Sequence, residues 1–214
     1  MIEICNVFAP ECTPDWNGVG AVATTLAAGV ALLLPFVLAY FERSKKERER
    51  RSVVQEVCSA VDRISAYHEV ANLLLANEII YHPQHRACER ISENAIDLRR
   101  ALEILIRKPE LSDGAVTAAA SAERVAECLT KALATPYGLN QGDWDRRRAA
   151  LNANAMAAQN AALRSKGVRA SNNLGPSTAA AKIRQKYLAI IDDCNRAKQT
   201  QTAPTIVDID DTAY

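Results

Sequence analysis

The hydrophobic pattern of this chain is dominated by one uninterrupted apolar stretch near its start. The residues from Gly18 to Phe41 include no charged side chain. As a helix rising about 1.5 Å per residue they would extend roughly 36 Å, which exceeds the hydrocarbon thickness of a bilayer at about 30 Å. We therefore predict a transmembrane helix over 18–41, because an isolated segment can satisfy its backbone hydrogen bonds in lipid only as a helix.

Six residues in and beside this stretch are expected to serve the membrane anchor: Trp16, Gly20, Thr24, Gly29, Pro35 and Tyr40. The aromatic residues suit the two membrane interfaces, and the proline removes one intrahelical hydrogen bond, which predicts a mild kink. The small residues recur at helical spacing. A second copy of the helix would be able to approach closely along such a stripe.

Beyond the anchor, apolar residues recur at the period of an α-helix, with proline and glycine between the periodic segments. The pattern predicts five helices, over 42–80, 84–107, 113–134, 143–167 and 177–198. The apolar stripe of the first is broad, which favours a bundle over a two-stranded coiled coil. We therefore expect an all-α protein with a single-pass transmembrane helix followed by a cytoplasmic bundle of about five helices.

These features divide the chain into five parts. A short extracytoplasmic tail covers 1–17, the transmembrane helix 18–41 and a basic juxtamembrane segment 42–52. An α-helical domain follows over 53–199. The segment 200–214 is acidic and has no helical period, so we expect it to be disordered. It contains a β-prone run, Ile206–Ile209, of the kind that adds a strand to the sheet of a partner.

Charge is distributed unevenly about the apolar stretch. Three of the 25 acidic residues precede it and all 26 basic residues follow it, so the side-chain charge is −3 before the stretch and +4 after it. Six basic residues lie directly after it: Arg43, Lys45, Lys46, Arg48, Arg50 and Arg51. The positive-inside rule then predicts a cytoplasmic C-terminal side and a translocated N-terminus.

The same basic residues are expected to contact anionic lipid headgroups, each gaining on the order of 1 kcal/mol. A nucleic-acid interaction is disfavoured, because the glutamates at 42, 47 and 49 interrupt the basic run and headgroups would lie beside it. In its first fifty residues the chain resembles small bacterial inner-membrane proteins. That resemblance implies a location in the inner membrane and no activity.

The cysteines fall on both sides of the anchor. Cys5 and Cys12 precede it, where an oxidising compartment would allow a disulfide. Four others follow it and are expected to be reduced, with three of them filling apolar helix faces.

One cluster has the composition of a metal site. His82, His85 and Cys88 lie within seven residues, and His85 and Cys88 share a helix face at i, i+3. These are zinc-ligand types, although a solvated turn between two helices would have the same composition. His68 lies at helical spacing with apolar neighbours, so we expect a partly buried histidine with a hydrogen-bond partner.

Motifs for nucleotide binding and hydrolysis are missing from the sequence: there is no glycine-rich phosphate loop, no G-x-S-x-G and no H-E-x-x-H. We therefore expect a protein that is not an enzyme and has no cofactor. Its expected partners are membrane lipids and either a second copy or another protein, bound through apolar helix faces in the manner of a membrane-tethered scaffold. The alternative is an effector that oligomerises into a pore under control of its cytoplasmic domain.

Overall fold

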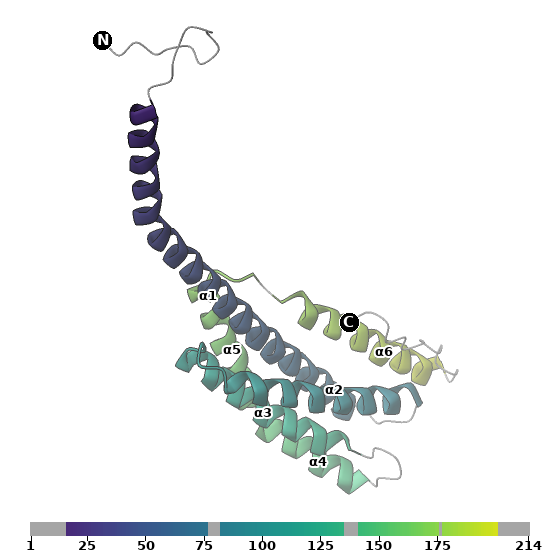
Figure 1. Cartoon of the computed structure of the whole chain (residues 1–214). Coiled ribbons are helices and arrows are strands. Elements are labelled where there is room, and N and C mark those ends of the chain that lie inside the picture. Colours follow the sequence, from purple (N-terminus) through teal and green to yellow (C-terminus); the bar gives the residue numbers. More distant parts are fainter. Residues whose placement is uncertain (1–15, 77–81, 135–140, 176, 201–214) are drawn as a thin grey trace. The chain divides into compact units, whose positions relative to one another are not determined.

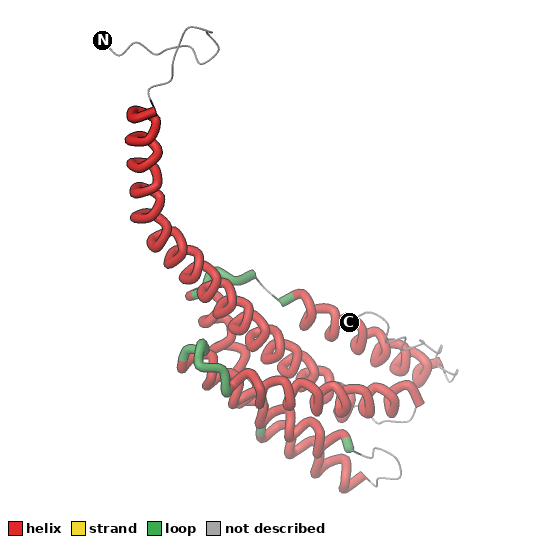
Figure 2. Tube along the Cα trace, in the orientation of Figure 1, coloured by secondary structure: helices red, strands yellow, loops and turns green. Residues whose placement is uncertain are grey.

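The computed structural model describes residues 16–76, 82–134, 141–175 and 177–200, and every regular element in these ranges is a helix (Figures 1 and 2). In chain order the helices are α1 (Trp16–Ala76), α2 (His82–Ile106), α3 (Asp113–Leu133), α4 (Gln141–Ala153), α5 (Ala155–Ser171) and α6 (Thr178–Thr200). The all-α prediction is confirmed.

The chain forms two compact units, Met1–Glu49 and Arg50–Tyr214. Helix α1 is continuous from Trp16 to Ala76, so it contributes its first part to one unit and residues 50–76 to the other. The second unit is a helical bundle. Helix α3 packs against α2, α4 and α5, and α2 also packs against α6.

The core of the bundle is built from the apolar faces that the periodicity indicated. In α1 the buried residues are Val54, Val57, Val61, Ile64, Ala71 and Leu75, and in α2 they are Ile91, Ala95, Leu98, Leu102 and Leu105. Helix α6 buries Ile183, Tyr187, Ile190 and Cys194 on the same principle. The bundle therefore forms because each helix has one apolar stripe and must cover it against its neighbours.

Two helix starts follow from local chemistry. Ser112 caps α3, since its hydroxyl accepts a hydrogen bond from the Ala115 backbone N–H at 3.4 Å, as predicted. Helix α2 begins at His82, two residues before the predicted start. Pro83 thus occupies the first turn, where its missing N–H leaves no intrahelical bond unmade.

The prediction of one helix over 143–167 is wrong, because α4 and α5 are separate helices on either side of Asn154. The Asn154 backbone N–H donates to the Leu151 carbonyl at 3.0 Å, and its side-chain amide donates to the Ala150 carbonyl at 2.9 Å. Short polar side chains that bind nearby backbone in this way compete with the regular helical bonds.

Helix α5 also continues past Gly167, the expected stop. It ends at Ser171, and Asn173 then adopts φ 53°, the left-handed conformation that asparagine tolerates better than most residues. The Leu174 N–H returns to the Arg169 carbonyl at 3.0 Å, which closes the turn. The helix-terminating residues are therefore the asparagines of the N-N-L-G run and not the glycine at 167.

Candidate functional site

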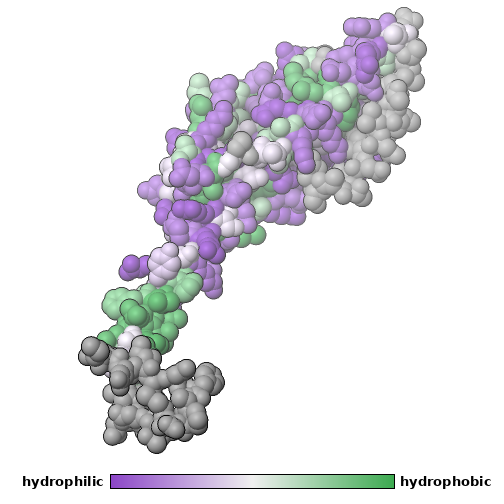
Figure 3. All heavy atoms as spheres, turned by 90° about the horizontal axis from the view of Figure 1, so that it is seen from above, coloured by the Kyte–Doolittle hydropathy of each residue, from purple (hydrophilic) through white to green (hydrophobic). Residues whose placement is uncertain are grey.

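The apolar part of α1 is exposed along its described length. Ten large hydrophobic side chains between Leu26 and Phe41 are 45–75% exposed: Leu26, Val30, Leu32, Leu33, Leu34, Phe36, Val37, Leu38, Tyr40 and Phe41. Figure 3 shows this stretch in green. Within the described residues, α1 is the one helix long and apolar enough to cross a membrane, and none of its most apolar window is buried.

The energy of this exposure is large on the scale of protein stability. Burying a fully exposed side chain of this size stabilises by about 1.5–3 kcal/mol, so ten partly exposed ones represent roughly 10–20 kcal/mol. A whole domain is typically stable by only about 5–15 kcal/mol. Contiguous apolar surface of this extent is typical of a site covered by lipid or by another protein.

The helix is continuous through Pro35, which lies inside α1. Gly29 lies on an open face, since a Cβ added to it would have no heavy atom within 4 Å. Tyr40 contacts the Phe41 ring edge-on, with 6.2 Å between centroids. The backbone at Trp16 and Gly20 is helical, and their side chains lie outside the described part of the structure, as do Cys5 and Cys12.

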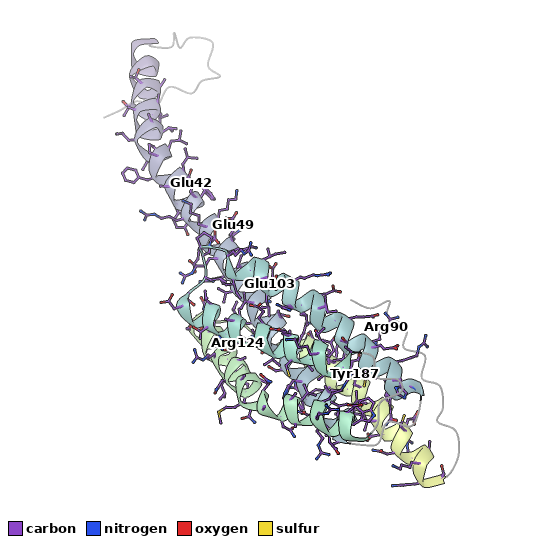
Figure 4. All side chains as sticks on the ribbon, turned by 90° about the horizontal axis from the view of Figure 1, so that it is seen from below. Glu42, Glu49, Arg90, Glu103, Arg124 and Tyr187 are labelled. Carbon is purple, nitrogen blue, oxygen red and sulfur yellow. The ribbon has the colours of Figure 1, made fainter. Side chains whose placement is uncertain are left out.

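A charged segment follows directly along α1. The six basic residues from Arg43 to Arg51 are all exposed. Lys45 and Glu49 approach at 3.9 Å with both side chains more than half exposed, so this pair contributes little. Glu42 and Glu49 are labelled along this part of α1 in Figure 4. The segment therefore keeps its cationic groups available to solvent or to anionic headgroups.

The residues of the predicted metal cluster differ in their surroundings. Cys88 is fully buried, and burial, with a smaller contribution from Glu89, raises the pKa of its thiol to about 12. A zinc ligand must be the thiolate, so this environment disfavours coordination. No group of three or more His, Cys, Asp or Glu side chains is gathered for a metal among the described residues. The side chain of His82 lies outside them, and the metal site stays a prediction.

A polar stripe on α1 was not anticipated from the sequence. Cys58, Asp62, Ser65 and His68 follow one another at spacings of four and three residues, and all face α4 and α5. Their counterparts are Ser165, the Ala158 carbonyl and the Leu151 carbonyl, which are seven residues apart. The two helical runs are therefore antiparallel, and the stripe fixes their register.

The centre of this stripe is a charged cluster. Arg169 and Asp62 form an ion pair at 2.5 Å with little exposure, and the Ser165 hydroxyl donates to the other Asp62 carboxylate oxygen at 3.0 Å. Ser165 is completely buried and Cys58 nearly so. Burial is the main cause that raises the pKa of the Cys58 thiol. A buried hydroxyl and a protonated thiol are poorly suited to nucleophilic chemistry, so these contacts are structural.

His68 is buried, as predicted, and has two partners. Its Nε2 lies 3.0 Å from the Leu151 carbonyl and must carry the proton, while Nδ1 accepts from the Asn72 amide at 3.4 Å. Burial lowers the pKa of His68, and the bond to Leu151 opposes part of that shift. The neutral imidazole thus binds a carbonyl at the break between α4 and α5.

A groove lies between α3 and α4, with a volume of about 470 Å³. Its rim includes Arg124, Lys131, Arg146 and Arg147, and alanine methyl groups form part of its wall. The arginine and lysine residues on these two helices gave no motif in the sequence. The i, i+7 spacing of Arg124 and Lys131 was the one signal that they share a helix face.

No family model, curated protein or solved structure matches this chain. Its own residues are therefore what indicates a function.

Proposed function

We propose that this protein is a non-enzymatic, single-pass membrane protein that presents its helical bundle as an interaction domain. The observation that carries the proposal is the exposed apolar part of α1, where ten large hydrophobic side chains have no cover among the described residues. In the proposed arrangement residues 18–41 cross the bilayer, and the bundle that follows is a scaffold or adaptor confined to the membrane surface.

The charge distribution supports one orientation. Basic residues occur only after the apolar segment, and the first six of them are exposed on α1. Translocating them would be costly, so the bundle lies on the cytoplasmic side and the N-terminus outside. The membrane proposed is the bacterial inner membrane, where anionic lipids would attract this segment.

The bundle itself supports binding more than catalysis. The nucleophilic side chains Cys58, Cys88 and Ser165 are buried, and the pKa values of the two thiols are raised. By contrast, Ile104, Met156, Leu163 and Leu188 place apolar side chains on the bundle surface. Such exposed positions on separate helices suit contact with a protein partner.

The membrane part of the proposal is tested with two matched arginine substitutions. Leu33 on the apolar segment and Leu163 on α5 are both 64% exposed, so Leu33→Arg and Leu163→Arg introduce the same group into water-like exposure. In cells, Leu33→Arg should reduce the carbonate-resistant membrane fraction several-fold, since arginine mid-span costs about 2.5–3.5 kcal/mol on insertion. Leu163→Arg should not change it. Equal behaviour of the two variants would contradict membrane insertion.

A second candidate function, an oligomeric membrane effector, is favoured by the open face at Gly29. If copies associate there to form a pore, expression should release a small dye from cells or vesicles, and Gly29→Ile should abolish the release. The scaffold proposal predicts intact membranes and a stable second protein that remains with the chain after in-cell crosslinking. Leakage sensitive to Gly29→Ile would replace the scaffold by the effector.

A further inference from the structure

The groove between α3 and α4 combines an apolar wall with an excess of positive charge. Four cationic side chains line it against a single carboxylate, Glu127. The wall includes Ala132 and Ala150, whose methyl groups give it apolar surface. A ligand suited to such a groove carries carboxylates and compact apolar groups together.

The cations of the groove are only loosely engaged. Lys131 binds Glu127 at 2.6 Å and Arg146 binds Asp143, but the two cationic side chains are at least three-quarters exposed. Ion pairs of this kind contribute about 0–1 kcal/mol, so they can be exchanged for other carboxylates. Arg147 instead bonds the Ala132 carbonyl at 3.0 Å and caps the end of α3. Within the described part of the chain, Arg124 has no ion pair.

The groove and the end of α6 lie at the same end of the bundle. It is formed by the second half of α3 and by α4, and Figures 1 and 2 show the C-terminal ends of α3 and α6 and the start of α4 on one side. Fourteen residues follow Thr200, and at about 3.3 Å per extended residue they reach roughly 46 Å. That exceeds the length of α6, which is about 35 Å.

These fourteen residues have the complementary composition. The run Ile206–Asp211 reads I-V-D-I-D-D, with three carboxylates and three β-branched apolar side chains, and no lysine or arginine follows Lys198. We propose that Ile206–Asp211 binds in the α3–α4 groove of its own chain, with its aspartates at Arg124, Lys131 and Arg146 and its isoleucines on the alanine wall. The acidic segment is then an internal ligand that a partner's acidic segment must displace.

This inference does not depend on the membrane proposal, because both the groove and the segment belong to the second unit. Its test uses the full-length chain in mild detergent with Thr212→p-benzoylphenylalanine as a photoreactive probe. Irradiation followed by peptide mass spectrometry should place most crosslinks within residues 124–154. Crosslinks scattered over the bundle, or concentrated elsewhere, would overturn the proposal.

Charge reversal supplies the specificity. Arg124→Glu with Arg146→Glu should reduce the crosslink at least fivefold, and lysines in place of Asp208, Asp210 and Asp211 should restore it in that background. The control is Arg90→Glu with Arg100→Glu, which reverses two exposed arginines on α2 that also pair locally. Figure 4 labels Arg90 and Arg124 on different helices, well apart. A crosslink indifferent to all these changes would end the proposal.

Two further measurements close the remaining routes. If the arginine variant loses helicity, the bundle is left intact by Asp208→Asn, Asp210→Asn and Asp211→Asn together, which should lower the crosslink to the same extent; no decrease would refute the contact. Mixing isotopically heavy and light protein separates contacts within a chain from contacts between chains. Crosslinks of mixed mass in place of single-chain ones would assign the groove to a second copy and overturn the internal contact.

Discussion

The carboxylate of Asp62 on α1 lies 2.5 Å from the guanidinium of Arg169 on α5, and the two side chains are only 15% and 11% exposed. They are 107 residues apart in sequence and bring the first and fifth helices together. Ser165 satisfies the second carboxylate oxygen, so the pair is buried with its hydrogen-bonding capacity used. A buried pair of this kind specifies register more than it adds stability.

Asp62→Ala should lower the free energy of unfolding of the bundle by about 3 kcal/mol, because it leaves the Arg169 charge buried without its partner. Urea unfolding in mild detergent, followed by far-UV circular dichroism, measures the change. Glu93→Ala is the control, since it breaks the exposed pair with Arg90 and should cost less than about 1 kcal/mol. Similar losses in the two variants would show that Asp62 and Arg169 are not a buried pair in solution.

The stability of the bundle should fall as the pH decreases below about 6.5. Burial lowers the pKa of His68 in the folded chain, so the unfolded chain binds a proton first on acidification. Between the ordinary pKa near 6.5 and the lower folded value, this group reduces the free energy of unfolding by at most about 1.4 kcal/mol per pH unit.

Comparison of His68→Gln with the parent chain at pH 7.5 and 5.5 isolates this contribution, because the other two histidines are present in both. Glutamine can still donate to the Leu151 carbonyl and does not titrate. The parent should lose more stability than the variant over this interval. Equal losses would mean that His68 titrates alike in the folded and unfolded chains.

Gly167→Ala should raise the free energy of unfolding by about 0.5–1 kcal/mol, because Gly167 lies inside α5 and alanine has the higher helix propensity. A Cβ at this position would have no heavy atom within 4 Å, so no clash opposes the gain. Thermal unfolding measures it. Gly175→Ala, outside any helix, is the control and should change the stability less; a destabilised Gly167→Ala would indicate that α5 ends earlier.

The four cysteines of the bundle should react with iodoacetamide in a fixed order. Cys128 is partly exposed and should be modified before Cys88, which is fully buried and has a thiol pKa of about 12. Peptide mass spectrometry at increasing times gives the order, and urea should abolish it. A chelator should not alter the rate at Cys88; acceleration by chelator, together with stoichiometric zinc lost in His85→Ala, would instead establish the predicted metal site.

The sequence by itself determined the elements of this protein. The uncharged run at 18–41 and the 3.6-residue apolar stripes of the later segments specify helices locally, because helix formation and amphipathicity depend on residues within a few turns of one another. The buried faces of α1, α2 and α6 were predictable for this reason, as was the Ser112 cap.

Only the tertiary structure decided which helices meet and what holds their register. The pairing of Asp62 with Arg169, the bond from His68 to Leu151 and the α3–α4 groove each join residues from distant segments, and nothing in either local sequence encodes the partner. The break at Asn154 belongs to the same class. An asparagine in an alanine-rich helix is locally tolerable, and in the fold it coincides with donors to the carbonyls of Ala150 and Leu151 from Cys128 of α3 and His68 of α1.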